Sequence, residues 1–133
     1  MTDGHCPFEK AILCGCGKCS RAEKHSIAER EAVSCSFQSS LDRCVRLHDL
    51  LKEKALFSLR LTHLQERLPH AKEMKIQCGG LIGLEKAVSG KEQVHDVSGL
   101  VDRAVDMFGE LESLPYSEIV QSVSAFAIRQ RGR

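Results

Sequence analysis

Residues 40–68 read SLDRCVRLHDLLKEKALFSLRLTHLQERL and hold the most regular hydrophobic pattern of the chain. The core-facing positions recur every three or four residues, the spacing that places side chains on one face of an α-helix. A helix over about 40–68, ended by Pro69, would be about 40 Å long because each residue adds about 1.5 Å. We expect it to be the central scaffold of the fold, with Cys44 facing the core. The positions in the pattern are Leu41, Cys44, Val45, His48, Leu51, Ala55, Leu56, Leu59 and Leu64.

Shorter helices are predicted on both sides of this stretch. Before it, residues 8–13 can form about two turns, and residues 20–34 are rich in alanine and in oppositely charged pairs. After it, apolar residues repeat at helical spacing over 74–84, 100–111 and 116–127. No period-two pattern of convincing length is present, so no strand is predicted. The predicted fold class is all-α, a compact bundle of five to six helices in a single domain. Its parts are a cysteine-rich arm at 1–19, a metal-binding helical core at 20–93 and a C-terminal helical hairpin at 94–133.

The charge balance excludes several classes of partner. The chain has 133 residues with 19 Lys and Arg against 18 Asp and Glu, so no overall field attracts nucleic acid or an anionic membrane. Aromatic residues are few, which argues against base stacking. No apolar stretch approaches the roughly 20 residues of a membrane span, and no secretory signal precedes the cysteines. We expect a cytoplasmic protein with reduced thiols.

Seven cysteines are the strongest chemical signal. Three of them lie in Cys14-Gly15-Cys16-Gly17-Lys18-Cys19, and Cys6 precedes Pro7. Thiolates are soft metal ligands, and glycines between them let the backbone turn tightly enough for several sulfur atoms to face one centre. The glycines of Cys78-Gly79-Gly80 also suggest that the backbone bends there or approaches another segment closely. The pattern therefore predicts a metal site, but not which four thiols build it.

Two arrangements are open. In a local site, Cys14, Cys16 and Cys19 share a centre with Cys6, His5 or His25 as the fourth ligand. In a distributed site, Cys35, Cys44 and Cys78 converge with one thiol of the N-terminal arm. A helix over 20–34 would hold Cys19 and Cys35 roughly 20 Å apart, too far for one centre. We favour the distributed site, with Cys6 as its arm ligand, and Cys16 or Cys19 only if that helix is shorter or bent. The predicted metal ligands are thus Cys6, Cys16, Cys19, Cys35, Cys44 and Cys78, whereas Cys14 is expected to tolerate substitution.

The ligand spacing favours an iron–sulfur cluster, of the 4Fe–4S type, over zinc. Zinc sites commonly use paired C-x-x-C knuckles, and this chain has that spacing once, from Cys16 to Cys19. The bacterial ferredoxin run of cysteines is absent as well, but irregular ligands from several helices suit a cluster better. His48 follows Cys44 by four residues, and a lone histidine on such a face is more often a core or boundary residue than a ligand.

Function is predicted from these thiols. The favoured hypothesis is a small iron–sulfur protein that acts in electron transfer or in redox or oxygen sensing beside a partner enzyme, and is not itself an enzyme. Its Cys78 edge and N-terminal arm would contact the partner, and a homodimer could share a cluster. An alternative is a zinc-stabilised or metal-free helical interaction module. A second alternative is a thiol-redox protein that uses Cys16 and Cys19, although the βαβ context typical of that motif is missing.

Overall fold

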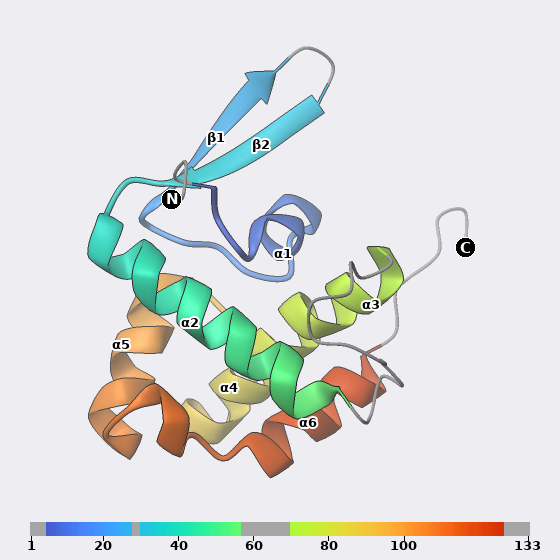
Figure 1. Ribbon diagram of the computed structural model, residues 1–133, viewed down its shortest axis with the longest axis vertical. Coiled ribbons are helices and arrows are strands. Elements are labelled where there is room, and N and C mark those ends of the chain that lie inside the picture. The colour runs from blue at the N-terminus through green and yellow to red at the C-terminus, as the bar shows by residue number, and fades with distance from the viewer. Residues whose placement is uncertain (1–4, 28–29, 57–69, 127–133) are drawn as a thin grey trace.

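The computed structural model describes residues 5–27, 30–56 and 70–126, and the described part is mainly helical with one small sheet (Figure 1). The helices pack around a common hydrophobic core, while the two strands project from one end of it (Figure 1). The elements in chain order are α1 Glu9–Cys14, β1 Ala22–Ile27, β2 Arg30–Cys35, α2 Gln38–Ala55, α3 His70–Met74, a π-helical segment Lys75–Gly79, α4 Gly80–Ser89, α5 Val97–Phe108, a 3₁₀ turn Leu111–Ser113 and α6 Tyr116–Ala125.

The predicted helix over 20–34 is wrong, because this stretch forms an antiparallel β-hairpin. Strands β1 and β2 pair from Ala22 opposite Cys35 at the open end to Ile27 opposite Arg30 at the closed end. The all-α prediction is corrected accordingly to a mainly helical fold with a two-stranded sheet.

Tertiary hydrogen bonds explain why a stretch with helical composition becomes a strand pair. The backbone N–H of Cys6 donates to the carbonyl of Val33 at 2.9 Å, and the N–H of Val33 donates to Glu9 Oε2 at 2.8 Å. Helix propensity is a weak preference that such long-range partners readily outweigh. The hairpin also brings Cys19 and Cys35 to the same end of the sheet, because Ala22 pairs with Cys35 and donates its N–H to the Cys19 carbonyl. The predicted separation of roughly 20 Å between these two cysteines does not exist.

Helix α2 confirms the main hydrophobic pattern over its first half. Its buried residues follow the predicted three- and four-residue spacing, and the helix contacts α6, the π-helical segment, α5 and β2. The part of the predicted helix beyond Leu56 falls on residues 57–69, outside the described residues, and the central role of this helix stays a prediction. The buried residues are Leu41, Cys44, Leu47, Leu50, Leu51 and Ala55.

The glycines after Cys78 allow two helices to approach closely, as the sequence predicted. A β-carbon on Gly79 would lie 2.6 Å from the Val123 Cα, and one on Gly83 would lie 3.0 Å from the Ile119 Cα. Helix α6 therefore packs with its backbone against the π-helical segment and α4. This contact holds the segment that carries Cys78.

The predicted C-terminal helical hairpin stays a prediction. Among the described residues, the main contacts of α5 and of α6 include α4. Their apolar faces, with Leu100 and Ala104 on α5 and Ile119 and Val123 on α6, are fully buried. The core needs both faces directed inward, and α4 provides the common surface.

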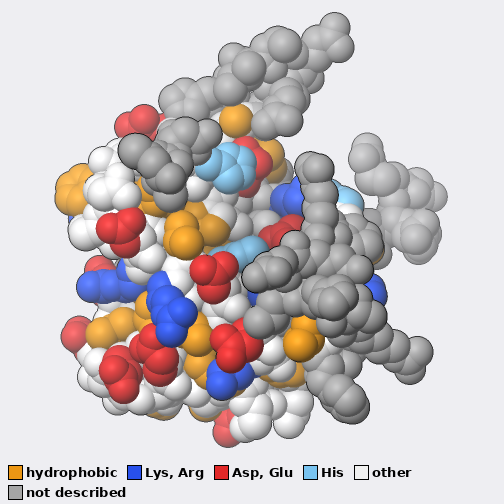
Figure 2. All heavy atoms as spheres, in the orientation of Figure 1, with side chains coloured by type: hydrophobic (Ala, Val, Ile, Leu, Met, Phe, Trp, Pro, Cys, Tyr) orange, Lys and Arg blue, Asp and Glu red, His pale blue; other side chains and the backbone are white. Residues whose placement is uncertain are grey.

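The face of the molecule in Figure 2 carries charges of both signs. On the face shown in Figure 2, acidic and basic side chains lie next to one another over the helices. Within the described residues no helix combines the length and the apolar character that a bilayer crossing requires.

Candidate thiol site

Three cysteines from two distant parts of the chain converge at one point. The Sγ atoms of Cys14, Cys16 and Cys78 all lie within 4.8 Å of one another, and Cys16 and Cys78 form a disulfide with a Cα–Cα distance of 5.6 Å. The Cys14 Sγ lies 3.3 Å from the Cys16 Sγ and 3.6 Å from the Cys78 Sγ. We call these three residues the compact group.

The turn after α1 places Cys14 and Cys16 side by side. Gly15 adopts a left-handed conformation with a φ of 90°, which glycine accepts without the steric cost of a β-carbon. The N–H of Gly15 donates to the carbonyl of Ile12, and the N–H of Cys16 donates to the carbonyl of Ala11 at 2.9 Å. The chain thus folds back on α1, and the Cys-Gly-Cys spacing is the signal that could have identified Cys14 as part of the site.

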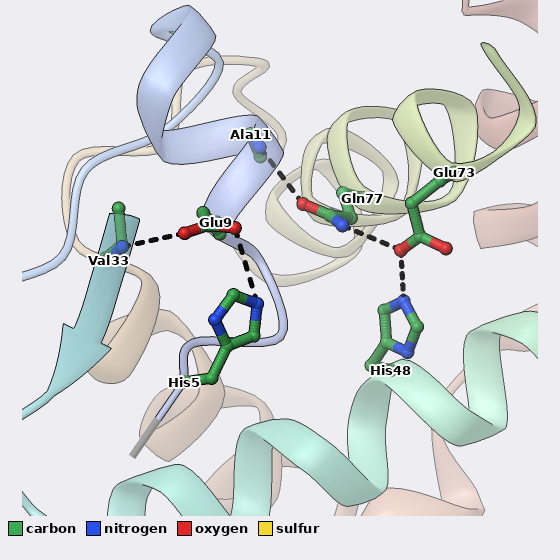
Figure 3. Close-up of polar contacts among 7 residues, drawn as sticks. All are labelled: His5, Glu9, Ala11, Val33, His48, Glu73 and Gln77. Carbon is green, nitrogen blue, oxygen red and sulfur yellow. Dashed lines mark hydrogen bonds and ion pairs between the residues drawn. The ribbon is translucent and has the colours of Figure 1, made fainter. Parts of the chain in front are cut away.

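A buried polar network fixes the distance between this turn and Cys78 (Figure 3). The backbone N–H of Ala11 donates to Gln77 Oε1 at 3.0 Å, and Gln77 Nε2 donates to Glu73 Oε2 at 2.7 Å. The same Glu73 oxygen contacts His48 of α2. Gln77 immediately precedes Cys78, so the network ties α1 to the π-helical segment at the residue next to the thiol.

The electrostatics of Glu73 favour its ionised form. Burial raises the pKa of this carboxyl, but the hydrogen bonds from His48 and Gln77 outweigh it and hold the pKa below its ordinary value of 4.5. A charged Glu73 is a stronger acceptor for Gln77, and this strengthens the positioning of Cys78. His48 is therefore a boundary residue whose Nε2 contacts Glu73, and its ring packs edge-on against the ring of Phe8.

The compact group is open to solvent on one side. Cys14 is exposed, Cys16 is half-buried and Cys78 is fully buried. A surface cleft of about 410 Å³ includes Cys14 and Cys19 in its wall, together with the amines Lys18 and Lys24.

The geometry of the compact group suits one metal ion. A tetrahedral zinc ion with Zn–S bonds of about 2.3 Å holds its sulfur ligands about 3.8 Å apart. The two distances from the Cys14 sulfur, 3.3 and 3.6 Å, are close to that separation. A cluster of several irons spreads its cysteine sulfurs over different iron atoms and therefore needs more room. Three thiols here could hold an ion, but only after the disulfide between Cys16 and Cys78 is reduced.

The remaining predicted ligands lie elsewhere. Cys6 borders β2, Cys19 and Cys35 flank the open end of the hairpin, and Cys44 lies in α2. The structure brings two of the predicted ligands, Cys16 and Cys78, together in the compact group. It adds Cys14, which the prediction left out. It also pairs Cys16 with Cys78, whereas the thiol-redox alternative paired Cys16 with Cys19.

Comparisons of this chain with models of protein families, with curated proteins and with solved structures find no match. The chemistry of the thiols is therefore the basis for any functional conclusion.

Proposed function

We propose that this chain is a redox-sensing protein in which Cys16 and Cys78 alternate between a disulfide and two thiolate ligands of a metal ion. Cys14 supplies the third ligand. One observation carries the proposal: the two sulfurs that are bonded to each other belong to a group of three whose atoms all lie within 4.8 Å. A sulfur pair cannot be a disulfide and two thiolate ligands at the same time, so oxidation and metal binding compete.

The switching step balances with a peroxide as oxidant. Cys16 and Cys78 lose two electrons and form the S–S bond, the O–O bond of hydrogen peroxide breaks, and two water molecules result. When the thiolates start as metal ligands, the two protons come from solvent and the ion loses two of its three protein ligands. A dithiol reductant restores both thiols by exchange. The exposed Cys14 lies within 3.6 Å of both bonded sulfurs and offers a route for that exchange.

Zinc is the metal that this geometry supports best. Zinc accepts three protein ligands and a fourth from outside the chain, and it has no redox chemistry of its own that would obscure thiol oxidation. The fourth position would face the solvent side of Cys14, where water or a side chain of a partner protein can enter. The alternative of a zinc-stabilised interaction module uses the same ligands but requires the metal to stay bound when peroxide is added.

Peroxide-driven zinc release tests the proposal. Protein reduced with a dithiol is loaded with zinc, freed of excess metal and treated with hydrogen peroxide, while a chromogenic chelator records released zinc and mass spectrometry maps disulfides. We expect zinc release in step with formation of the Cys16–Cys78 bond. Cys16→Ser and Cys78→Ser should each abolish the part of the zinc release that depends on peroxide.

The control is Cys35→Ser, which removes a half-buried thiol outside the compact group and should retain the peroxide response. Zinc release that persists unchanged in Cys16→Ser and Cys78→Ser, or a disulfide that maps to other cysteines, would refute the proposal. Retention of zinc at full disulfide formation would favour the interaction module.

A further inference from the structure

Cys14, the exposed member of the compact group, lies in the wall of a surface cleft. The end of α1, the glycine turn that follows it and the first half of β1 line this cleft, whose volume is about 410 Å³. Small-molecule sites in proteins span about 300–1,000 Å³. The cleft is therefore of the size that holds a small molecule.

The charges in the cleft wall favour an anionic ligand. Among the described residues, the lining includes the amines of Lys18 and Lys24 and no carboxylate. Lys24 shares a face of β1 with Ala22, which also lines the cleft, because side chains two residues apart on a strand point the same way. Glu23 lies between them and is not part of the lining. Two amines in a recess attract a negatively charged ligand and disfavour a positively charged one.

The turn that carries Lys18 is held in place on both sides of Cys19. The carbonyl of Lys18 accepts the N–H of Val97 at 2.7 Å. The N–H and the hydroxyl of Ser20 donate to the two oxygens of Asp96 at 2.8 and 3.1 Å. These bonds also engage the Asp96 carboxylate, which does not line the cleft. Because this wall is formed in advance, a ligand loses little free energy to ordering it.

The thiol in this wall selects a ligand that contains sulfur as well as negative charge. Cys16 and Cys78 are bonded to each other, so Cys14 is the free thiol of the compact group. Cys19 lines the same cleft but is half-buried, whereas Cys14 is exposed. Thiols exchange with disulfides by attack of one sulfur on another. A carboxylate or phosphate without sulfur would use the two amines and leave this thiol without a reaction partner.

We propose that the cleft binds the disulfide of a small acidic thiol and that Cys14 forms a mixed disulfide with it. The Cys14 thiol gives its proton to solvent, and its sulfur attacks one sulfur of the ligand R–S–S–R. The S–S bond of the ligand breaks, a Cys14–S–S–R bond forms, and the other half leaves as a thiolate that takes up a proton. Cys14 is oxidised and the leaving half is reduced, so the step needs no other oxidant. The reduced form of the same small thiol reverses it.

The modification would change the compact group at its accessible edge. Cys16 and Cys78 have no free thiol while they are bonded to each other, so neither can displace the substituent from Cys14. A modified Cys14 can no longer be a metal ligand. This last consequence rests on the proposed function, whereas ligand binding and exchange at Cys14 do not.

Time courses with two disulfides of opposite charge test the proposal. Metal-free protein with the Cys16–Cys78 bond intact is treated with glutathione disulfide, which is anionic, or with cystamine, which is cationic. Free thiols are then blocked with N-ethylmaleimide, and peptide mass spectrometry locates each adduct. Each rate is divided by the rate of the same disulfide with the neutral thiol N-acetylcysteinamide, which removes differences in intrinsic reactivity. We expect the first adduct at Cys14, with a normalised rate for glutathione disulfide at least about fivefold above that for cystamine, since surface ion pairs are individually weak.

Variants identify the groups responsible. Lys18→Gln/Lys24→Gln should abolish the preference for glutathione disulfide, and Cys14→Ser should remove the fastest adduct. Lys52→Gln/Lys54→Gln is the matched control, because it removes the same charge from the last turn of α2, outside the cleft lining, and should keep the wild-type preference. Far-ultraviolet circular dichroism should show the wild-type helix content in all of these variants.

Equal normalised rates for the two disulfides in wild type, or a first adduct at Cys19 or any other cysteine, would overturn the proposal. A preference that survives in Lys18→Gln/Lys24→Gln would overturn it as well. These measurements use protein without zinc, whereas the zinc-release experiment is scored on the Cys16–Cys78 bond. Failure of one proposal is therefore distinguishable from failure of the other.

Discussion

The compact group and the other four cysteines, Cys6, Cys19, Cys35 and Cys44, contain the same residue type, but their surroundings differ. We call these four residues the four-thiol group. In the compact group, Cys14 is exposed at the wall of a cleft beside two lysines, and its sulfur lies close to the disulfide. In the four-thiol group, the side chains of Cys6 and Cys44 are each only 7% exposed. Exposure makes a thiol accessible to oxidants, whereas burial raises its pKa and keeps it inert toward them. The comparison indicates that the compact group is the more accessible to oxidants and that Cys6 and Cys44 are the more protected from them.

The two groups also depend on different parts of the fold. The compact group needs the π-helical segment to stay against α6 and α1, whereas the four-thiol group needs the hairpin to stay against α2. A change in one support should therefore affect one group and spare the other. The predictions below use this separation.

Gly79→Ala should disrupt the compact group. The new methyl group would lie 2.6 Å from the Val123 Cα and 2.8 Å from the Ser122 carbonyl oxygen, so α6 must move away from the segment that carries Cys78. Overpacking against backbone costs about 3 kcal/mol, more than the roughly 1 kcal/mol that alanine gains over glycine in a helix. Urea denaturation should show a net loss of about 2 kcal/mol, and the Cys16–Cys78 bond should form more slowly with peroxide.

Gly83→Ala is the matched comparison for this prediction. Its methyl group would meet the Ile119 Cα at 3.0 Å, a milder contact one turn further along α4 and not adjacent to Cys78. Gly83→Ala should lower the free energy of unfolding by less than Gly79→Ala does. It should leave the rate of Cys16–Cys78 bond formation as in wild type. Equal slowing in both variants would show that the helix contact as a whole, not the position of Cys78, controls the compact group.

Alkaline pH should destabilise the four-thiol group in metal-free, reduced protein. The pKa of Cys6 is raised from 9.0 to about 11, so the folded state favours the neutral thiol more than the unfolded state does. This contribution to stability is complete below pH 9.0 and is lost as the pH rises through about 11. Two pKa units correspond to roughly 2 to 3 kcal/mol, which urea denaturation at about pH 8 and about pH 10.5 should detect in large part.

Cys6→Ala should remove much of this loss of stability at alkaline pH, whereas Cys14→Ser should leave the loss in place. A loss that is unchanged in Cys6→Ala would show that the buried thiols do not govern stability at high pH.

Local patterns predicted a large part of the helical structure. The apolar spacing of α2 identified its buried face, and Gly79 beside Cys78 indicated a close backbone approach. The hairpin escaped prediction because Ala22, Glu23 and Lys24 favour a helix locally. The residues that hydrogen-bond to Val33 on the paired strand, Cys6 and Glu9, lie outside that stretch. Propensity carries no information about such distant partners.

The sequence predicted cysteines that could bind a metal, but not that Cys14, Cys16 and Cys78 come together. Cysteine number and glycine spacing indicated a metal or redox site, but the pairing of Cys16 with Cys78 spans 62 residues. Gln77, next to Cys78, accepts a hydrogen bond from the backbone of Ala11, and no local pattern around Gln77 indicates this contact. The predicted distance between Cys19 and Cys35 was wrong because it assumed a helix over 20–34. A hairpin reverses the chain and brings its two ends together, whereas a helix holds them apart.

Acid should weaken the compact group through Glu73, in the smallest of the expected effects. Because the pKa of Glu73 is lowered in the folded state, its contribution to stability is present above about pH 4.5 and is lost as the pH falls through the folded-state pKa. Protonation weakens the contacts of Glu73 with Gln77 and His48, and one hydrogen bond to a charged group is worth about 1.5 kcal/mol. Glu73→Gln should therefore flatten the acid side of the stability curve by about 1 kcal/mol relative to wild type.

Glu112→Gln is the control for this last prediction, because Glu112 also has a lowered pKa through Arg46 but lies on the open surface away from both thiol groups. It should leave reduction of the Cys16–Cys78 bond by a dithiol unchanged at every pH. In wild type and in Glu112→Gln alike, that reduction should become easier as the pH falls and Glu73 is protonated, since α1 and the π-helical segment are then less firmly joined. In Glu73→Gln this pH dependence should be absent. If Glu73→Gln and wild type show the same pH dependence, the network through Gln77 does not position Cys78, and the close packing of α6 on Gly79 must hold the compact group by itself.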